Sequence, residues 1–427
     1  MKTPKIVFIG AGSMSFGIPT FKDIFTTPEL KGATLSLVDI DEENLERMYA
    51  LALTMNEASG MELNIEKTME RRDVLPGADY IVNSLAIERC DLWKHDFAVP
   101  LKHGIKHCLG ENGGPGALFF GMRTIPLIMD ICRDIEELCP DAWFLNFSNP
   151  ESRIVLAVNK YTNVKCIGLC HGIFMAQHDV SHILGRNPES VEVTAAGMNH
   201  FQWLLTIRDR ETGEDLYPEL VAKEADFDPS FEPFTRKMFR AVGLWPTCSD
   251  DHLGEYLPYG YEAGMEGYDF DQDEQDRVQM KKNIKEVVSG VQDPMDWLVK
   301  SGEKAIEVIT ALHTGKRAYI PSAVVYNGGA ITNLPDDVAV EIPVIVEKDN
   351  ISKVHIGDLR QSVRSLLSLQ CGAQQMAVDA AMYGDKAMAY QALLADPVIN
   401  STEAARKIVD ELWEINKPYI KATLEKW

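Results

Sequence analysis

Two side chains that can bind a metal ion, Cys170 and His200, each stand near an apolar stretch of this sequence. Cys170 follows the run Val164 to Leu169, which predicts a buried strand, and open α/β folds bind their ligands at the carboxyl ends of such strands. A Cys and a His from neighbouring elements could share one divalent cation and leave coordination positions for a substrate, as a catalytic site requires. A buried free thiol beside a core-edge histidine is the simpler interpretation of these two residues alone.

The N-terminal segment has the pattern of a dinucleotide-binding turn. Lys5 to Ile9 predicts a strand, a glycine-containing turn follows, and a helical pattern begins directly after it. Gly10 permits a tight turn, and Gly12 lets the backbone approach a pyrophosphate at the helix N-terminus. We expect both glycines, together with Ser13 and Met14, to lie against a bound cofactor.

An acidic residue, Asp39, ends the second predicted strand, Thr34 to Val38. A carboxylate there accepts hydrogen bonds from a ribose diol and repels the extra phosphate of NADP, so the pattern favours NAD. Ser15 stands where a third glycine is usual, and Asp39 could equally be an ordinary strand-end or helix-capping residue. The glycines and the acid together predict a nucleotide-binding domain.

Strands continue to alternate with helices through the first part of the chain. The runs Asp79 to Ser84 and Ala142 to Asn146 predict two more buried strands, with helical patterns between them. We therefore expect a Rossmann-like, doubly wound α/β sheet over residues 1–165. Residues 166–427 have a mixed pattern with a helical C-terminal part, which predicts an α+β domain for metal and substrate binding and for oligomerisation.

The bulk composition excludes several classes of function. The 427 residues carry a net charge of −22, which argues against nucleic acid and anionic membranes as partners. Eight irregularly spaced cysteines are no disulfide framework, and no apolar stretch approaches the roughly 18 residues that span a bilayer. The N-terminus runs directly into a predicted strand, leaving no signal peptide. We expect a cytoplasmic protein with reduced thiols.

Further motifs occur in a definite order along the chain. They are Gly110-Glu111-Asn112-Gly113-Gly114-Pro115-Gly116, Gly121-Met122-Arg123-Thr124-Ile125-Pro126, Asn146-Phe147-Ser148-Asn149-Pro150-Glu151, Cys170-His171-Gly172, Gly197-Met198-Asn199-His200, Glu255-Tyr256-Leu257-Pro258 and Gly328-Gly329-Ala330-Ile331-Thr332-Asn333-Leu334-Pro335. Together with the glycine turn and the two metal candidates, these motifs resemble glycoside hydrolase family 4, the NAD- and metal-dependent glycosidases, from Lys5 to about Pro397.

The resemblance implies a hydrolysis outside the two-carboxylate schemes of most glycosidases. NAD would take hydride from the sugar C3, and the resulting ketone would acidify the C2 proton. A divalent cation would stabilise the enediolate, elimination would expel the C1 leaving group, and water addition and hydride return would regenerate NAD. Members of the family usually form homodimers or homotetramers.

The resemblance also implies roles for individual residues. Cys170 and His200 match the metal ligands, with Mn²⁺ or another divalent cation, although hard–soft preference for Cys plus His would suggest zinc. Asn149 matches a position beside the metal and the sugar hydroxyls. His171 matches the acid that assists leaving-group departure, and could alternatively only orient Cys170.

The base that removes the C2 proton is less well defined. Relatives of one branch use a tyrosine in the segment Ser249 to Tyr256, so Asp251 and Tyr256 are both candidates. Asp250 and Asp251 could instead simply cap a helix.

The residues after Cys170 bear on the sugar. The sequence Cys170-His171-Gly172-Ile173 resembles the α-glucuronidase branch, with α-galacturonidase and α-galactosidase as alternatives. Gly172 lacks a side chain, which we expect to leave room for a bulkier sugar substituent. A uronic acid carboxylate would need a cation, and Arg89, Arg123 and Lys106 are candidates, each of which could equally be a surface or cofactor-phosphate residue.

Two other classes share the first domain. An NAD-dependent hydroxy-acid dehydrogenase would produce net NADH, but it would not need the pair Cys170 and His200. A regulatory NAD-binding protein would show no metal dependence, and the sequence lacks a basic DNA-binding element.

Overall fold

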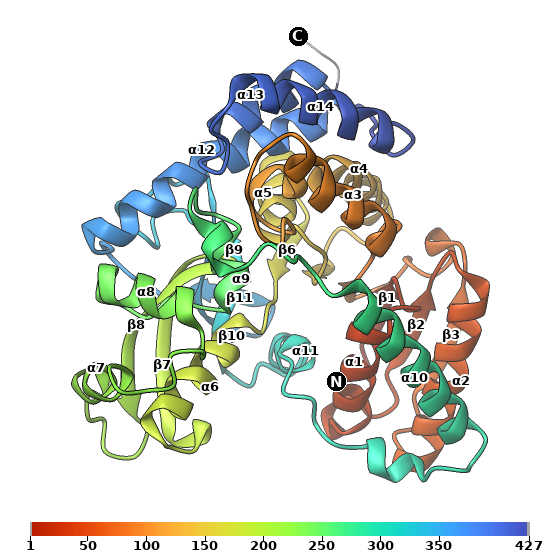
Figure 1. The fold of residues 1–427 in the computed structure, drawn as a ribbon. Coiled ribbons are helices and arrows are strands. Elements are labelled where there is room, and N and C mark those ends of the chain that lie inside the picture. The colour runs from red at the N-terminus through yellow and green to blue at the C-terminus, as the bar shows by residue number, and fades with distance from the viewer. Residues whose placement is uncertain (1, 425–427) are drawn as a thin grey trace.

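Six parallel strands form the first half of one eleven-stranded sheet, in the order β3-β2-β1-β4-β5-β6 (Figure 1). This is the order of a doubly wound nucleotide-binding fold, whose ligand crevice lies where the strand order reverses, at β1 and β4. The computed structural model describes residues 2–424. The elements of this half are β1 (Lys5–Ile9), α1 (Met14–Phe25), β2 (Thr34–Val38), α2 (Glu42–Ser59), β3 (Asn64–Thr68), β4 (Tyr80–Asn83), α3 (Arg89–Lys102), α4 (Gly114–Leu138), β5 (Trp143–Asn146), α5 (Glu151–Tyr161) and β6 (Lys165–Gly168).

The second half continues the same sheet in antiparallel pairing, through β9, β10, β7 and β8, with β11 beside β10. The expected fold class, a Rossmann-like sheet followed by an α+β part, is confirmed. The elements are α6 (Gly172–Leu184), β7 (Val191–Met198), β8 (Phe201–Asp209), α7 (Tyr217–Glu224), α8 (Pro233–Val242), α9 (Asp250–Gly254), α10 (Phe270–Val288), α11 (Ala305–Thr314), β9 (Ala318–Tyr326), β10 (Ala339–Glu347), β11 (Asn350–Lys353), α12 (Gln361–Tyr383), α13 (Lys386–Ala395) and α14 (Thr402–Asn416).

The two expected parts, residues 1–165 and 166–427, are closely joined. Strand β6 begins at Lys165 and pairs with β5 in the parallel half, while its last residue, Gly168, pairs with β9 of the antiparallel half. Helix α10, from the second part of the chain, packs beside α2 of the first part (Figure 1). The sheet therefore runs without a break across the expected boundary.

Strand β1 is buried on both faces, as a parallel strand covered by helices should be. Ile6 and Phe8 pack into one hydrophobic core with α1 and α2, whereas Val7 and Ile9 pack into a second core with α4 and α5. This alternation follows from the two-residue period of a strand. The turn that follows β1 is thereby held in a fixed position at the carboxyl edge of the sheet.

A break in helical structure separates α10 from α11. Helix α10 ends at Val288 and α11 begins at Ala305, with a short 3₁₀ turn at Pro294–Trp297 between them. Gly290 follows the end of α10 with a φ of +74°, a backbone conformation that suits glycine, and Pro294 cannot continue a helix.

Helix α4 is long and apolar enough to cross a membrane by length and composition alone, but 89% of its most apolar window is buried inside the protein. Such burial is typical of a core helix.

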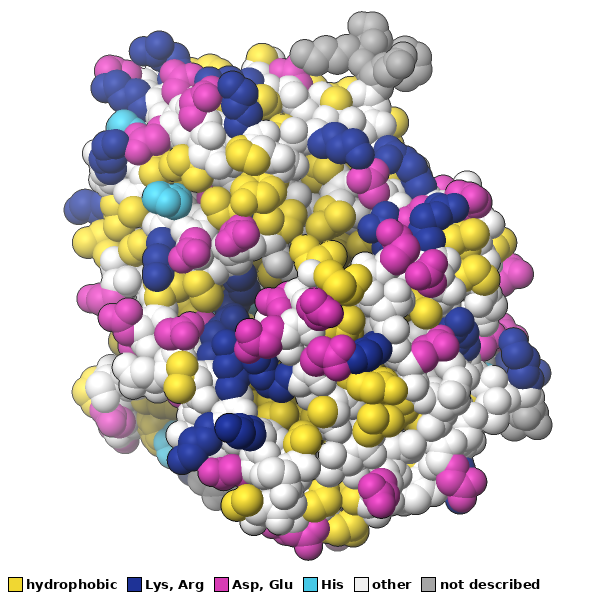
Figure 2. All heavy atoms as spheres, turned by 90° about the vertical axis from the view of Figure 1, so that its right-hand side faces the viewer, with side chains coloured by type: hydrophobic (Ala, Val, Ile, Leu, Met, Phe, Trp, Pro, Cys, Tyr) yellow, Lys and Arg dark blue, Asp and Glu magenta, His cyan; other side chains and the backbone are white. Residues whose placement is uncertain are grey.

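On the face of the molecule in Figure 2, acidic, basic and hydrophobic side chains are interspersed.

Arg123 of α4 lies in this interior and not among the other predicted site residues. Its guanidinium is fully buried, forms a 2.6 Å ion pair with Asp96 of α3, donates a hydrogen bond to Asn416 of α14 and stacks on Phe120. Burial raises the pKa of Asp96 to about 6 even though Arg123 opposes the shift. We therefore replace the sugar-binding role predicted for Arg123 with a structural one.

Replacing Arg123 should destabilise the fold. Arg123→Met leaves the buried Asp96 carboxylate without its partner, which should lower the free energy of unfolding by about 3–5 kcal/mol in urea denaturation. The double variant Arg123→Met/Asp96→Leu should recover most of this loss. Arg133→Met, which breaks an exposed pair on the same helix, should cost less than about 1 kcal/mol. Unchanged stability with a raised KM in Arg123→Met would contradict the structural role.

Candidate active site

A row of paired residues marks the place where the parallel half of the sheet meets the antiparallel half. Gly168 of β6 pairs with Val324 of β9, Val324 pairs with Glu341 of β10, and Glu341 pairs with Gly197 of β7. The chain leaves this row at Gly168 toward Cys170 and at Gly197 toward the turn that holds His200. Strand pairing thus brings together two segments that are separated in sequence.

Glu341 is a buried carboxylate at the centre of that row. It accepts hydrogen bonds from Ser322 Oγ at 2.6 Å and from Asn199 Nδ2 at 3.1 Å. Burial raises its pKa, and these hydrogen bonds oppose the rise. Asn199 directly precedes His200, so Glu341 holds the turn that presents the predicted histidine ligand.

The thiol of Cys170 lies among buried groups that become negatively charged when they ionise. Burial raises its pKa well above the usual value, and the charges of Glu341, Cys248 and Glu151 raise it further. Glu151 is itself fully buried at the start of α5, with a raised pKa and one carboxylate oxygen without a hydrogen-bond partner among the described residues. A divalent cation would compensate these groups and favour the thiolate, so the surroundings of Cys170 fit a metal site.

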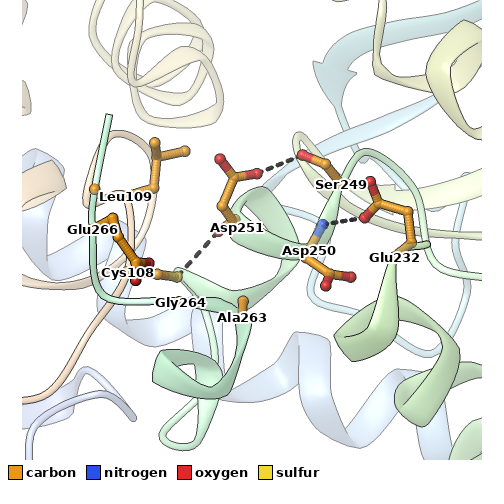
Figure 3. Close-up of a pocket in the computed structure, with 10 residues that line it drawn as sticks. Cys108, Leu109, Glu232, Ser249, Asp250, Asp251, Ala263, Gly264 and Glu266 are labelled. Carbon is orange, nitrogen blue, oxygen red and sulfur yellow. Dashed lines mark hydrogen bonds between the residues drawn. The ribbon is translucent and has the colours of Figure 1, made fainter. Parts of the chain in front are cut away.

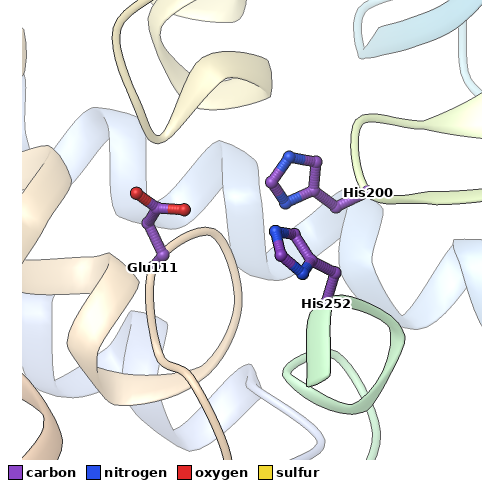
Figure 4. A group of neighbouring side chains, drawn as sticks. All are labelled: Glu111, His200 and His252. Atoms are coloured by element: carbon purple, nitrogen blue, oxygen red, sulfur yellow. The ribbon is translucent and has the colours of Figure 1, made fainter. Parts of the chain in front are cut away.

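His200 lies in a second group of possible ligands. Nitrogen and oxygen atoms of Glu111, His200 and His252 lie within 4.8 Å of one another, and the three side chains come from separate segments (Figure 4). Burial and the neighbouring His252 lower the pKa of His200 to about 3, which leaves its imidazole neutral, the form that binds metals. His200 also has a φ of +59°, an uncommon conformation that is concentrated at functional sites.

Glu255 connects this group to the glycine-rich loop. Its Oε2 accepts hydrogen bonds from the backbone N–H groups of Glu111 and Asn112, both at 2.8 Å. A Cβ on Gly113 would lie 2.3 Å from the carbonyl oxygen of Glu255, so the close approach requires glycine there. Asn112 Nδ2 in turn lies 3.2 Å from His200 Nδ1. The loop therefore positions Glu111 and orients His200.

Of the two candidate bases, Asp251 is the one whose side chain is ionised. Its carboxylate contacts His252 Nδ1 at 2.7 Å and accepts a hydrogen bond from Ser249 Oγ. Burial opposes ionisation, yet the bonds and charge of His252 and the bond from Ser249 hold the pKa of Asp251 well below its usual range. The carboxylate is therefore ionised near neutral pH, but while it is paired with His252 it holds a proton only weakly, so a role as base requires that this pairing be loosened.

Tyr256 has a different position from the one expected of a base. Its hydroxyl is buried and donates a 2.9 Å hydrogen bond to the carbonyl of Asn199, and its ring stacks on Phe201. Burial and the charge of Glu255 raise the pKa of the phenol well above its usual value. A phenol that must lose its proton is disfavoured here, so we reassign Tyr256 to positioning the turn before His200.

His171 has the properties of a proton donor. Its side chain is half exposed, and Nδ1 lies 3.5 Å from a carboxylate oxygen of Glu303. The hydrogen bond to Glu303 raises the pKa of His171 even though partial burial opposes the shift. A protonated imidazole at the edge of the site suits the leaving-group acid predicted from the sequence.

The glycine turn after β1 has the geometry of a dinucleotide site. Gly10 has a φ of +79°, and a Cβ on it would lie 2.8 Å from the Leu85 backbone nitrogen beyond β4. The backbone N–H of Gly12 donates to Asp39 Oδ2 at 2.8 Å. Ser13 is the N-cap of α1 and Met14 its first residue, so the predicted cofactor residues do lie together at the helix N-terminus.

The remaining predicted residues lie at the border of this region. Asn149 is half-buried, between the end of β5 and the start of α5. Arg89, the first residue of α3, forms ion pairs with Glu111 at 3.3 Å and with Asp273 at 3.8 Å. Arg89 is therefore next to one possible metal ligand. Lys106 lies over the ring of Tyr261.

Gly172 does not leave the open space that we expected. A Cβ on this residue would lie 2.3 Å from Cys248 Sγ and 3.8 Å from Cys170 Sγ. The sulfur of Cys248, a residue with a φ of +64°, occupies the position of a side chain at residue 172. The glycine is therefore explained by packing against Cys248 and not by room for a sugar substituent.

Several residues of the site were missed from sequence. His252 is next to the predicted Asp251, and Glu111 lies within the glycine-rich motif. The sequence therefore pointed to both segments but not to these two side chains. Glu341 carries a signal of its own, because it is a charged residue within an apolar strand. Cys248 carries no signal that sequence alone could provide.

Comparison with known proteins identifies the family. The model of family 4 glycosyl hydrolases matches residues 5–186, and the model of the C-terminal domain of the same family matches residues 195–399. The chain belongs to the family 4 glycosyl hydrolases.

Similar proteins carry several activities. An α-galactosidase of Bacillus subtilis is 30% identical over 95% of this chain and 95% of its own, and an α-glucosidase of Erwinia rhapontici is 29% identical over 97% and 98%. The structure of a 6-phospho-α-glucosidase from gut microorganisms, in complex with NAD and Mn²⁺, has a TM-score of 0.83 at 22% identity, covering 99% of this chain and 100% of that one.

Adding a side chain at residue 172 should test the packing at Cys170. Gly172→Ser should lower the free energy of unfolding by about 1–3 kcal/mol, because its Cβ overlaps Cys248 Sγ. Combining it with Cys248→Ala should restore most of the loss in thermal or urea unfolding. Gly372→Ala, at a helical glycine with open space around it, should be neutral or stabilising by up to about 1 kcal/mol. Additive losses in the double variant would contradict this explanation.

Proposed function

We propose that this protein is an α-glycosidase that uses NAD and a divalent cation, with Mn²⁺ as the expected metal. The observation that carries the proposal is the meeting of Cys170 and the His200 turn around the buried carboxylate Glu341. The dinucleotide turn at Gly10 and Gly12 and the family membership support it. A similar structure contains NAD and Mn²⁺, which is consistent with the same cofactors here.

The residues present fit both groups. Gly10, Gly12, Ser13, Met14 and Asp39 would hold NAD, because the two glycines let the turn pack closely against β4 and Asp39 and the turn ends at a helix N-terminus. When bound, NAD reversibly accepts the hydride of the sugar C3, and the cation acidifies the C2 proton.

The metal would be held by Cys170 and His200. Glu111 lies beside His200 and is available as a further ligand. Burial opposes protonation of His252, but its hydrogen bond to Asp251 raises its pKa to about 9, so His252 would have to lose a proton before it could bind a metal. The buried carboxylates around Cys170 supply negative charge that a cation neutralises. Cys plus His would also accept zinc, which a metal titration distinguishes from manganese.

Two side chains carry out the two proton transfers, one at the sugar C2 and one at the leaving-group oxygen. Asp251, which is ionised, accepts the C2 proton, and His171, whose hydrogen bond to Glu303 raises its pKa, donates to the departing oxygen. Asn149 orients the sugar hydroxyls.

For the sugar we propose an α-glucuronide. The Cys170-His171-Gly172 motif supports this choice through its resemblance, and Arg89 is the cation that a uronic acid carboxylate would contact. A second candidate is a neutral α-galactoside or α-glucoside, favoured by the buried carboxylates of the site and by the names of the relatives. An α-galacturonide is an alternative uronic acid substrate.

We also propose a cytoplasmic location and a homodimer or homotetramer. All eight cysteines are free, which is typical of a reducing compartment. Light scattering of the purified protein measures the assembly directly.

Activity should depend on every component of the site. Hydrolysis of p-nitrophenyl α-D-glucuronide should require NAD, Mn²⁺ and a thiol reductant, and should stop when any one is omitted. Cys170→Ala should abolish turnover while NAD affinity by calorimetry changes less than about two-fold, because the thiol lies outside the dinucleotide turn. Cys139→Ala, a buried thiol at the end of α4, is the control and should remain active. Full activity of Cys170→Ala, or net NADH accumulation, would overturn the proposal.

The sugar preference should depend on Arg89. Arg89→Gln should lower kcat/KM for the glucuronide about 10–100-fold relative to the galactoside, since a charged hydrogen bond contributes about 1.5–3 kcal/mol. Arg277→Gln removes a neighbouring cation that pairs with the same Asp273, and should leave the ratio unchanged. Preferred hydrolysis of the galactoside or glucoside by the wild type would move the sugar to the second candidate.

A further inference from the structure

A cavity of about 350 Å³ lies beside α9, next to the candidate active site (Figure 3). Its volume falls within the range of small-molecule sites in proteins. Four separate segments form its walls. The lining residues are Cys108, Leu109, Glu232, Ser249, Asp250, Asp251, Ala263, Gly264, Glu266 and Gly267.

One wall of the cavity is shared with the site. Asp251 lines the cavity and also contacts His252 Nδ1 at 2.7 Å. The ring of His252 lies 4.5 Å from the ring of His200, centroid to centroid. A substrate that reaches the proposed metal ligand His200 therefore has the cavity as its near neighbour.

The cavity is not the place of the reacting sugar. That ring must contact the residues proposed for the metal, Cys170 and His200, and the cofactor turn. Of the described residues that line the cavity, Asp251 alone belongs to the proposed catalytic group. A ligand in the cavity would therefore lie next to the reacting sugar, with Asp251 between the two.

The lining has the chemistry of a site for hydroxyl groups. Asp250, Asp251 and Glu266 contribute carboxylates, Glu232 contributes a further carboxyl group, and the described lining contains no Lys or Arg. Carboxylates accept hydrogen bonds from hydroxyls, whereas a second anion beside them is repelled. Leu109 and the small residues of the 263–267 loop supply apolar wall for the C–H face of a ring.

Two of these carboxyl groups already interact with each other. Glu232 Oε2 accepts the backbone N–H of Asp250 at 2.7 Å, and the carboxylate of Asp250 accepts the N–H groups of Phe234 and Thr235 at the start of α8. Burial and the nearby Asp250 raise the pKa of Glu232 to about 8. At neutral pH Glu232 can therefore donate as well as accept a hydrogen bond, and added negative charge there is disfavoured.

We propose that this cavity binds the leaving group of the glycoside and selects a hydroxyl-rich group without negative charge, such as a second neutral sugar. The inference rests on the proposed glycosidase function and adds the substrate class on the other side of the cleaved bond. It is compatible with a uronic acid as the reacting sugar, because Arg89 pairs with Glu111 and is not part of the cavity lining.

The test compares leaving groups that share one reacting sugar. The substrates are the p-nitrophenyl α-glycoside that the enzyme accepts, a disaccharide of the same sugar with a neutral reducing end, and that disaccharide oxidised to its aldonate. The wild type should hydrolyse the aldonate with a kcat/KM at least about ten-fold below that of the neutral disaccharide, because its carboxylate meets the acidic lining. Equal values for the two disaccharides would overturn the proposal.

A charge-removing variant assigns the effect to this cavity. Glu266→Gln keeps the size of the side chain and should reduce the difference between neutral and aldonate substrates several-fold. Glu262→Gln is the matched control. Glu262 pairs with Lys237, is four residues away in sequence and does not line the cavity, so this variant should leave the ratio unchanged. An equal effect of both variants would show a general charge effect and contradict the proposal.

Turnover of the aryl glycoside distinguishes a failure of the cavity assignment from a failure of the proposed glycosidase function. Turnover of the aryl glycoside with no discrimination between the disaccharides would overturn the cavity assignment and leave the glycosidase function in place. Absence of turnover on every α-glycoside would overturn the proposed function, and the leaving-group assignment with it.

Discussion

The buried carboxylate of Glu341 is the constraint on which the centre of this molecule depends. Its backbone pairs with strands on both sides, and its side chain binds Ser322 and the turn residue Asn199. A charge taken out of water is costly unless other groups compensate it. Here hydrogen bonds compensate part of the cost, and the remaining negative potential acts on Cys170. The fold therefore prepares a place for positive charge at the junction of its two halves.

Glycines allow the surrounding groups to come this close. A Cβ on Gly168 would lie 2.6 Å from a carboxylate oxygen of Glu151, and one on Gly172 would overlap the sulfur of Cys248. The same principle operates in the loop beside Glu255, where Gly113 meets a carbonyl oxygen. These glycines serve close approach in the interior, in contrast to Gly10, whose positive φ forms a turn. Substitution at either kind of position would separate groups that must act together.

The acidic character of the site and of the adjoining cavity has a consequence for specificity. Around Cys170 the carboxylates favour a cation, which would in turn bind oxygens of the proposed sugar substrate. Around Asp250 and Glu266 no described cation lines the wall, so hydroxyl groups are the suitable partners. One protein can thus favour a metal ion in one place and exclude anions in the next, because the local arrangement of charges and not the net charge of −22 decides each interaction.

The sequence by itself determined the dinucleotide turn, the alternation of strands and helices in the first half and the two metal candidates, because each depends on local pattern: strand, glycine and helix start follow one another within a few residues. Only the tertiary structure decided which distant groups meet. Glu341 joins Cys170 through strand pairing, Glu111 and His252 join His200, Tyr256 is turned toward a backbone carbonyl, and Arg123 pairs with Asp96 in the interior. The residues next to a side chain in sequence do not show which distant residue it contacts in the fold. The burial and the charge of the side chain depend on that contact.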